Sequence, residues 1–235
     1  MCGVCGCESH AHLHAHAHAD VRRVAVERSL LEENERHARA LRARLDALGI
    51  EAIGLVGGAG CGKTALLEAT LGRGVPAHAE AVIEGDCASD LDARRIAARG
   101  ARAVQINTGS LCHLDAHLVE HALESLDLRG VRRLWIENVG NPVCPAAFAC
   151  GEARRVVVVS VAEGDDKPEK YPALFGGADL VVVSKLDLLP HTDFSLERCV
   201  ARVRALEPGL EVLALSARSG AGMDAWLAWL QKPSR

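Results

Sequence analysis

The sequence predicts an α/β fold with a largely parallel central sheet flanked by helices. Short apolar segments alternate with helix-like segments along most of the chain, a pattern typical of strand–helix repeats in a parallel sheet. A glycine-rich loop at residues 57–64 lies between the first such strand and the helix after it. The polar segments that hold candidate functional residues follow predicted strands, and carboxyl ends of parallel strands share one edge of a sheet.

Length and composition favour one domain and limit its partners. The chain has 235 residues, 49% of them hydrophobic, which is enough to bury one substantial core. A formal net charge of −4 and the lack of a Lys/Arg block do not favour nucleic-acid binding. No apolar run reaches about 18 residues, the length of a membrane span, and the N-terminus shows no secretion-signal pattern. We therefore expect a cytoplasmic protein without a membrane segment.

Residues 1–19 are rich in Cys and His and have little with which to build a core, so we expect a flexible tail in the absence of metal. Thiolates of Cys2, Cys5 and Cys7 are close enough in sequence to converge on one nickel, zinc or copper(I) ion. Histidine occupies every second position from residue 10 to residue 18, so an extended chain would place these neutral imidazoles on one side. A solvated tail with no metal-binding task is the alternative.

Residues 20–49 are predicted to form one amphipathic helix. The segment from Val21 to Leu48 is rich in helix-forming residues, and its apolar positions recur at helical intervals. These positions are Leu31, Ala38, Leu41, Leu45 and Leu48. Gly49 suits a C-cap. We expect this helix to pack on the core and to take no part in the chemistry.

The predicted domain at residues 50–235 begins with a strand, a glycine-rich loop and a helix. Residues 52–56 are predicted to form a buried strand, and residues 65–71 a helix closed by Gly72. The loop between them fits G-x-x-x-x-G-K-[ST], and this strand–loop–helix context is the one that a phosphate-binding loop requires. A glycine-rich turn that matches the pattern by chance is the alternative.

The loop's residue types suit binding of a nucleoside triphosphate. Its flexible backbone can turn N–H groups toward the phosphates, and the N-terminus of the following helix adds a partial positive charge. Lys63 would reach the β- and γ-phosphates, and the Thr64 hydroxyl would bind a magnesium ion. The remaining residues expected to contact the nucleotide are Gly57, Gly58, Gly60, Cys61 and Gly62.

The rest of the chain continues the alternation of strands and helices. Strands are predicted at residues 81–83, 103–106, 134–136, 156–161, 180–183 and 212–215. Helices are predicted at residues 91–98, 114–126, 196–206 and 223–230. Asp86 follows the second strand, where its carboxylate either approaches the magnesium ion or is a solvated loop acid. Glu137 ends the strand at residues 134–136, and a loop is predicted at residues 138–145.

Residues 184–187, Ser-Lys-Leu-Asp, resemble the [NT]-K-x-D element of GTP-binding proteins. The carboxylate of Asp187 can accept hydrogen bonds from guanine N1 and the 2-amino group, donors that adenine lacks, and such a site can reject the wrong base by about 10⁴-fold. Ser216 and Ala217 resemble the loop that supports the base from the other side. Ser184 stands where Asn or Thr is usual, but Asp187 is retained. We therefore expect Asp187 to select guanine and Lys185 to contact the nucleotide.

A second group of candidate ligands lies within the predicted domain. Cys112 and His113 are followed one helical turn later by His117, and Cys144 lies in the loop after the next strand. These loops can be neighbours in a parallel sheet, so their side chains could meet around a tetrahedral zinc or a square-planar nickel ion. Packed cysteines and ordinary surface histidines are the alternative. Buried, non-ligating roles are expected for Cys61, Cys87, Cys150 and Cys199.

Together these residues resemble the hydrogenase nickel-incorporation GTPases of the HypB family, within the class of dimerising metal-insertion P-loop GTPases. The likeness runs from about residue 52 to the C-terminus, and Cys-x-x-Cys-Gly-Cys at residues 2–7 is similar to the family's optional nickel-binding start. The most specific segments are T-G-S-L-C-H-L-D-A-H at 108–117, E-N-V-G-N-P-V-C-P-A at 137–146 and E-G-D-D-K-P at 163–168.

The resemblance implies a GTPase that helps deliver nickel to the large-subunit precursor of [NiFe]-hydrogenase. It implies a small nickel-binding maturation partner and a homodimer in the GTP-bound state. Phosphate and magnesium would be bound by Lys63 and Thr64, and the residues acting around the metal ion and the attacking water would be Asp86 and Glu137. The implied nickel or zinc ligands of the domain are Cys112, His113 and Cys144, with His117 as an additional candidate and Cys150 in reserve.

The spacing of residues also suggests how nucleotide and metal could be coupled. Glu137 and Gly140 are placed to sense the γ-phosphate, and Cys144 is only four residues beyond Gly140. Movement of this loop on hydrolysis could shift one thiolate relative to Cys112 and His113, a coupling of about 1–3 kcal/mol.

Two rival functions are consistent with part of the sequence. A urease-type nickel-insertion GTPase could share the histidine-rich segment, but that family has Cys-Pro-His where this chain has Cys112-His113 and Cys144-Pro145 separately. A nickel or zinc storage and buffering protein would depend mainly on residues 1–19, with hydrolysis incidental. A small-molecule P-loop kinase is a distant third, because no acceptor pocket is evident.

Overall fold

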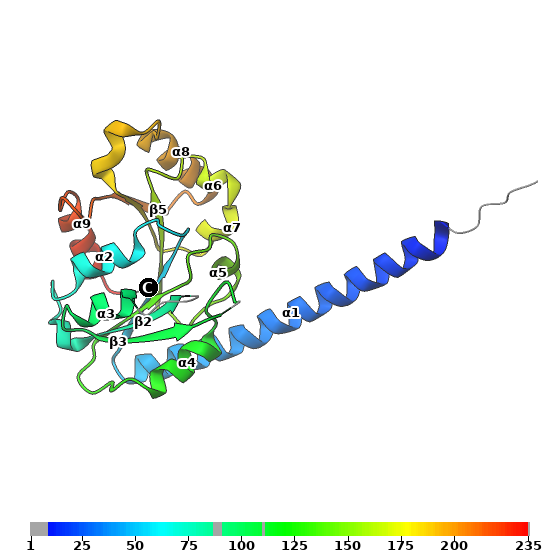
Figure 1. The fold of residues 1–235 in the computed structure, drawn as a ribbon, viewed down its shortest axis with the longest axis horizontal. Helices are drawn as coiled ribbons and strands as arrows, with labels where there is room; N and C mark the ends of the chain where they lie inside the picture. Colours follow the sequence, from blue (N-terminus) through cyan, green and yellow to red (C-terminus); the bar gives the residue numbers. More distant parts are fainter. Residues whose placement is uncertain (1–8, 87–90, 110, 235) are drawn as a thin grey trace, which may run out of the picture.

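The computed structural model describes residues 9–86, 91–109 and 111–234, without the side chains of residues 9–27. Within these residues, seven strands form one sheet (Figure 1). They are β1 (Glu51–Val56), β2 (Glu80–Asp86), β3 (Arg102–Asn107), β4 (Arg133–Glu137), β5 (Arg154–Ser160), β6 (Leu180–Ser184) and β7 (Glu211–Ala214). Their order is β3-β2-β4-β1-β5-β6-β7, and every neighbouring pair is parallel, so the predicted sheet is confirmed.

Helices cover both faces of the sheet (Figure 1). They are α1 (Ser9–Ala47), α2 (Lys63–Thr70), α3 (Leu91–Ala97), α4 (Ala116–Glu124), α5 (Cys144–Ala147), α6 (Lys167–Lys170), α7 (Pro172–Phe175), α8 (Leu196–Leu206) and α9 (Met223–Leu230). Two 3₁₀ helices are η1 (Ala77–Ala79) and η2 (Leu186–His191). None of the helices in the described part of the chain is both long and apolar enough to cross a membrane.

The strands divide their apolar side chains between cores on the two faces of the sheet. Successive residues of a strand point to opposite faces. Ile53 and Leu55 of β1 therefore join one core with Leu67 of α2 and Trp226 of α9. Ala52, the neighbour of Ile53 in β1, points to the opposite face of the sheet and joins a second core formed with α1 and α4. A third core lies between β5–β7 and helices α7 and α8.

The helix α1 begins earlier than the sequence predicts. Its described part starts at Ser9, inside the segment 1–19 that the composition predicts to be a flexible tail. Neither Gly nor Pro occurs between Ser9 and Leu48, so nothing in the chain interrupts the helix. The one-sided arrangement of histidines applies to an extended chain, whereas the structure describes the backbone of this segment as helical. Residues 1–8, with the predicted ligands Cys2, Cys5 and Cys7, lie outside the described residues, as does Cys87.

The C-terminal part of α1 packs on the domain through a shorter face than predicted. Ala38, Leu41 and Leu45 are buried, whereas Leu31 and Leu48 are exposed at 36% and 54%. Asn34 extends the buried face in place of Leu31. Its side-chain amide donates to the Ala149 carbonyl and accepts from the Ala116 amide, both at 2.9 Å, which ties α1 to the N-terminus of α4.

The boundaries of the later helices agree well with the sequence, but the shortest helices were missed. Helices α8 and α9 have the predicted bounds. Helix α4 begins at Ala116 and not at residue 114, because the Asp115 side chain caps it by accepting from the Leu118 amide. The four-residue helices α5, α6 and α7 are too short to show a hydrophobic period, and each has Pro in its first turn.

Replacing Leu67 with Ala should lower the free energy of unfolding by about 2–5 kcal/mol, because it would leave a cavity between α2 and the sheet. The side chain of Leu67 is 0% exposed. Urea denaturation followed by circular dichroism would measure the change. The matched control, Leu206→Ala at a position that is 38% exposed, should change stability by about 0.5 kcal/mol or less. Equal effects of the two substitutions would contradict this packing.

Candidate functional site

The glycine-rich loop wraps around the ammonium group of Lys63. This side chain is 6% exposed and donates hydrogen bonds of 3.3 Å to the carbonyl oxygens of Gly57 and Gly58. Gly57 has a φ of 154°, and a Cβ there would lie 2.2 Å from the Val158 carbonyl oxygen, so only glycine fits. Helix α2 begins directly after Gly62. Its first N–H groups therefore adjoin the loop, an arrangement that binds phosphate.

Carboxylates from two further elements meet at the Thr64 hydroxyl. Thr64 Oγ1 donates to Glu137 Oε1 at 2.8 Å and lies 3.3 Å from Asp92 Oδ2. Glu137 comes from the end of β4, and Asp92 from the first turn of α3. Glu84 of β2 is the register partner of Glu137. Asp86, the predicted metal ligand, ends β2 and belongs to the same acidic group.

Burial makes two of these carboxyl groups weak acids. It raises the pKa of Glu84 to about 8, helped by the charges of Glu137, Asp92 and Asp86. Burial also raises the pKa of Glu137 to about 7, although the charge of Lys63 opposes the rise. Among the described residues, Oε2 of Glu84 and Oε2 of Glu137 have no hydrogen-bond partner. Unpartnered carboxylate oxygens beside a hydroxyl suit a hard divalent cation, so the residues present fit magnesium.

A cavity of about 280 Å³ beside the loop is lined by the residues predicted to bind the base. Lys185, Asp187, Ser216 and Ala217 all line it, together with Gly62 of the loop. Ser216 Oγ donates to Asp187 Oδ1 at 2.5 Å, and this bond lowers the pKa of Asp187. The carboxylate is therefore ionised at neutral pH and can accept hydrogen bonds. The structure brings all four predicted base-site residues together.

The segment that carries Asp187 is tied directly to the glycine-rich loop. Ser184 Oγ donates to the Cys61 carbonyl oxygen, and Lys185 Nζ donates to the Gly60 carbonyl oxygen at 2.6 Å. Lys185 has a φ of 58°, in the left-handed region that costs a non-glycine residue about 1 kcal/mol or more. The serine in place of Asn or Thr therefore still anchors the base-binding segment to the phosphate-binding loop.

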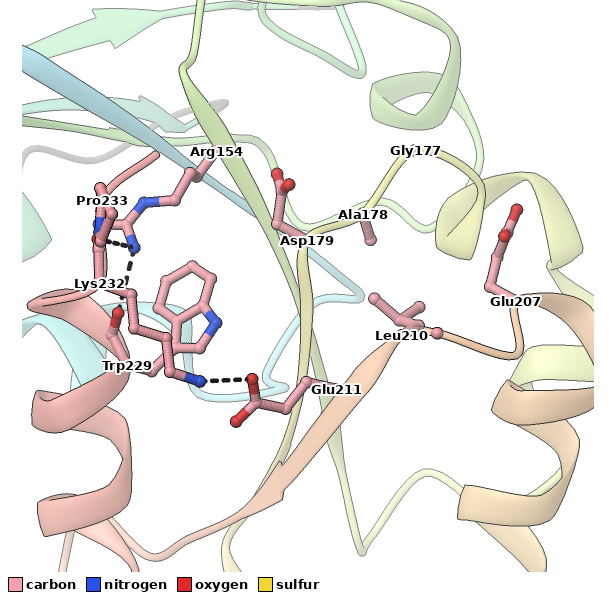
Figure 2. A pocket seen from close by; sticks show the side chains of 11 residues that line it. Arg154, Gly177, Ala178, Asp179, Glu207, Leu210, Glu211, Trp229, Lys232 and Pro233 are labelled. Carbon is pink, nitrogen blue, oxygen red and sulfur yellow. Dashed lines mark hydrogen bonds and ion pairs between the residues drawn. The ribbon is translucent and has the colours of Figure 1, made fainter. Parts of the chain in front are cut away.

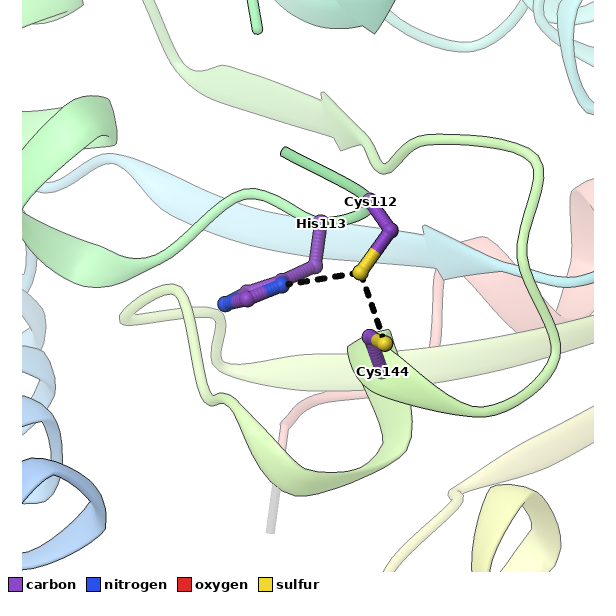
Figure 3. Close-up of side chains that lie close together, drawn as sticks. All are labelled: Cys112, His113 and Cys144. Carbon is purple, nitrogen blue, oxygen red and sulfur yellow. Dashed lines mark hydrogen bonds between the residues drawn. The ribbon is translucent and has the colours of Figure 1, made fainter. Parts of the chain in front are cut away.

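Cys112, His113 and Cys144 form the cluster expected for a metal site (Figure 3). Cys112 and His113 lie between β3 and α4, and Cys144 begins α5. The two Sγ atoms are 2.7 Å apart, and His113 Nδ1 lies 3.7 Å from Cys112 Sγ. One ligand atom from each residue lies within 4.8 Å of the other two. Two sulfurs and one imidazole nitrogen suit zinc or nickel and leave a coordination position open.

The protonation states of His113 and Cys144 determine whether protons must be released when a metal ion binds. Burial lowers the pKa of His113, so its imidazole is neutral and available as a ligand at neutral pH. The hydrogen bond with Cys112 raises the pKa of Cys144. The Cys144 thiol therefore keeps its proton until a metal displaces it, and binding of a divalent ion should release protons.

The two additional ligand candidates do not join the cluster. His117 lies on α4 with its ring 4.5 Å from that of His121 and 6.0 Å from that of His37 on α1. Cys150 is 2% exposed, its Sγ lies 3.3 Å from the Leu114 carbonyl oxygen, and burial raises its pKa well above the ordinary value. The expectation that Cys150 is a buried cysteine fits the structure, as it does for Cys61 and Cys199.

The segment between Glu137 and Cys144 connects the acidic group to the cluster. Asn141 pairs with Gly57 in an antiparallel bridge. A Cβ on Gly140 would lie 2.7 Å from the Ala59 Cα, so the segment lies directly against the phosphate-binding loop. The adjacent Asn138 Oδ1 accepts the amide of Leu114, two residues beyond Cys112, at 2.9 Å. This short segment thus contacts both the phosphate-binding loop and the segment between β3 and α4 that carries Cys112 and His113.

A larger cavity, of about 400 Å³, lies at the opposite edge of the sheet (Figure 2). It is bordered by Arg154 and Glu211, which begin β5 and β7, and by Asp179 just before β6. The Arg154 guanidinium lies 4.3 Å from the centre of the Trp229 ring and donates to the carbonyls of Trp229 and Lys232 at 3.2 Å. Lys232 pairs with Glu211 at 2.8 Å. These contacts hold the C-terminus of α9, and we assign them a structural role.

Sequence reasoning missed three residues of the site. Asp92 carries a visible signal, because it is an acid in the first turn of the predicted helix at residues 91–98. Glu84 directly follows the strand predicted at residues 81–83, and the structure extends this strand to Asp86, which buries the carboxyl group. Asn138 gives no signal of its own, because its hydrogen bond to Leu114 depends on how two distant loops meet.

In this parallel sheet the first strand leads into a glycine-rich loop that surrounds a lysine. The acidic residues and the residues that line the base cavity lie at the same edge of the sheet. These features define a P-loop nucleotide-binding protein. Residues 51–214 match the family described as CobW/HypB/UreG, nucleotide-binding domain. The chain belongs to this family.

Its relatives include proteins named hydrogenase maturation factor HypB. The chain is 53% identical over 214 residues to the one from Azotobacter vinelandii, covering 90% of this chain and 70% of that protein. It is 47% identical over 210 residues to the one from Escherichia coli (strain K12), covering 89% and 72%. The crystal structure of HypB from Helicobacter pylori in complex with nickel is 33% identical, with a TM-score of 0.80, and the match covers 84% of this chain and 93% of that chain. The resemblance indicated by the motifs is confirmed.

Replacing Glu84 with Gln should make the stability of the nucleotide-free protein less dependent on pH. A carboxyl group whose pKa is raised by folding holds its proton more tightly in the folded chain. Its contribution to stability is full below the ordinary pKa of 4.5 and is lost as pH rises through about 8. We expect the wild-type free energy of unfolding to fall in this range by up to about 1.4 kcal/mol per pH unit, and that of the variant to fall less.

Urea denaturation between about pH 5 and pH 8 would measure this slope. Glu35→Gln, at a side chain that is 53% exposed, is the matched control and should keep the wild-type slope. A wild-type slope in the Glu84→Gln variant would contradict the assignment of a raised pKa to this carboxyl group.

Proposed function

We propose that the protein is a GTPase that assists nickel insertion into [NiFe]-hydrogenase during its maturation. The observation that carries the proposal is the segment from Glu137 to Cys144. It begins at the hydroxyl of Thr64, lies against the phosphate-binding loop and ends at the thiol pair. A change at the phosphates would therefore act on a metal ligand through one short piece of backbone. The names of the relatives and the nickel complex of the Helicobacter pylori protein support this function.

Each part of the nucleotide site has a role in this proposal. Lys63 would exchange its carbonyl partners for the β- and γ-phosphate oxygens and neutralise the charge that develops there. Thr64, Asp86 and Glu137 would hold magnesium and its water ligands. When bound, magnesium would supply positive charge that offsets the negative charge of the phosphates. Asp187 would accept from the two guanine donors, with Ser216 holding its carboxylate in place.

In this proposal nickel is the cargo, and zinc is a second ion that the same ligands can bind. Cys112, His113 and Cys144 provide the domain site, and the first seven residues provide a separate thiolate site. Exchange of GTP for GDP would shift Cys144 relative to the other two ligands and change the affinity or geometry of the metal. The thiols must stay reduced to bind metal, which favours a cytoplasmic location.

The proposal includes partners. We propose that the GTP-bound form is a homodimer and that it acts with a nickel-binding maturation partner on the hydrogenase large-subunit precursor. A storage and buffering function is a second candidate, because histidine occurs at every second position of residues 10–18 and this part of α1 extends away from the domain (Figure 1). Deleting residues 2–18 separates them: storage capacity would be lost, whereas a maturation factor would keep GTP turnover and some hydrogenase activation.

Titration of nickel and zinc into the purified chain tests the coupling. Thiolate-to-metal absorption and oligomeric mass would be followed with GDP and with a non-hydrolysable GTP analogue. We expect nucleotide to change both signals, and Cys112→Ala to remove the domain component of the absorption. Cys199→Ala, at a buried cysteine outside the cluster, is the matched control and should keep it. Metal signals that are identical with both nucleotides and that come only from residues 1–18 would contradict the proposal.

Replacing Asp187 with Asn tests the choice of nucleotide. The amide cannot accept hydrogen bonds from both guanine donors, so we expect GTP affinity to fall by about 10²-fold or more. The affinity for xanthosine triphosphate, whose 2-oxo group can accept from the new amide, should rise. Equilibrium binding of the two fluorescent-labelled nucleotides measures this exchange. An unchanged preference for GTP would contradict the assignment of this cavity to the base.

A further inference from the structure

Three histidines, His37, His117 and His121, lie together where α1 packs against α4 (Figure 1). In this histidine trio, His117 and His121 are one helical turn apart on α4, and their ring centres are 4.5 Å apart. His37 comes from α1, and its ring centre is 6.0 Å from that of His117. Two histidines at positions i and i+4 of a helix can bind one metal ion, as in zinc-binding helices. The contact between α1 and α4 adds a third imidazole to such a pair.

The spacing of the three rings suits ligands of one ion. Imidazoles that bind an ion through nitrogen at about 2.1 Å have ring centres about 4.5 Å apart at a right angle and about 6.4 Å apart when they are opposite. The two separations in the trio, 4.5 and 6.0 Å, fall in this range. The helices therefore already hold the three side chains at the distances that a shared ion requires.

Side-chain rotation would bring the ring nitrogens together. Within residues 9–86, 91–109 and 111–234, only the cluster of Cys112, His113 and Cys144 already has its ligand atoms within 4.8 Å of one another. The side chains of His121 and His37 are 59% and 42% exposed, so their rings are not enclosed by packing. Exposed side chains change rotamer within nanoseconds. An ion can therefore gather these nitrogens without moving either helix.

A carboxylate supports the trio at the contact between the helices. Glu120 lies between His117 and His121 in the sequence of α4, and its Oε2 is 4.0 Å from His37 Nδ1. Its other oxygen lies 3.7 Å from the guanidinium of Arg44 on α1, so the carboxylate contacts side chains of that helix at two points. A carboxylate beside one nitrogen of an imidazole orients the ring and makes the other nitrogen a stronger ligand.

A cavity of about 420 Å³ borders both the trio and the cluster. His37 and His117 line it together with His113, the imidazole of the cluster. Two acidic residues, Glu33 and Asp115, also line the cavity. Their carboxylates make the space favourable for a cation. An ion that leaves the trio can therefore enter a space that a ligand of the cluster borders.

We propose that His37, His117 and His121 form a second metal site of the domain, which takes divalent ions that accept imidazole nitrogen, namely nickel, zinc and copper(II). The site contains no thiolate, so metal binding there does not require the loss of a thiol proton. The inference goes beyond the proposed function and does not depend on nucleotide. In a nickel-insertion protein, this site would hold cargo beside the cluster.

Titration of zinc into the full chain, with ¹⁵N-labelled histidine followed by NMR, tests the inference. Zinc is diamagnetic, so the signals of bound imidazoles shift and stay visible. We expect the signals of His37, His117 and His121 to shift together, at one common zinc concentration. His78, an exposed histidine on η1, is the internal control, and its signal should not shift at that concentration.

Replacing His121 with Gln removes one ligand from an exposed position, so the fold should be unaffected. Loss of a hydrogen bond to a metal ligand already costs about 10–100-fold in metal affinity, so loss of a ligand should cost at least tenfold. The zinc concentration that shifts the signals of His37 and His117 should rise by this factor. His78→Gln, the matched control variant, should leave it unchanged.

The outcomes separate this inference from the proposed function. Signals of the trio that shift at different zinc concentrations, or an unchanged response of His37 and His117 in His121→Gln, would overturn the inference and leave the proposed function as it is. A common shift that is weakened in His121→Gln and kept in His78→Gln would establish the site, whether or not the chain hydrolyses GTP.

Discussion

The functional edge of the sheet depends on the close approach of two backbone segments. Gly140 lies so near Ala59 that a side chain on it would collide with the phosphate-binding loop, and Asn141 bridges to Gly57 in the same place. This contact fixes what lies on either side of it in the sequence. Glu137 is held at the Thr64 hydroxyl, and Cys144 is held at Cys112. The phosphate-binding loop and the thiol pair therefore both contact the same short segment of backbone.

The acidic group at this edge stores unfavourable energy in the nucleotide-free protein. Burying a carboxyl group without a partner is costly, and the protein limits the cost by keeping protons on Glu84 and Glu137. A divalent cation would replace those protons and relieve the repulsion with Asp92. Buried polar atoms without hydrogen-bond partners are expected where a bound ligand supplies the missing contacts. The buried acidic group lowers the free energy of unfolding, and burial of apolar side chains in the three cores offsets this loss.

Much of this arrangement could be predicted because it depends on local sequence. The loop that holds Lys63, the bounds of α8 and α9, and the meeting of Cys112 with Cys144 all follow from motif, period and parallel topology. The position of His117 outside the cluster could not be predicted, because the orientation of α4 depends on its packing against α1. The contact of Asp92 with Thr64 could not be predicted either, because it depends on how Arg95 ties α3 to α2. The start of α1 differs from the prediction because a polar composition does not exclude a helix, and no Gly or Pro interrupts this one.

The length of α1 also determines how a metal ion could move between the histidine positions on this helix and the cluster in the domain. Leu30 borders the same cavity as His113, and the histidine positions begin at residue 18 on its N-terminal side. At a rise of about 1.5 Å per residue, residue 18 lies about 18 Å along the axis beyond Leu30, and residue 10 lies farther still. A rigid connection that cannot span two sites gives them an effective concentration near zero for one another. While α1 stays helical, a metal ion held there cannot pass directly to the domain site of the same chain, so its transfer requires release into solution or a second protein molecule.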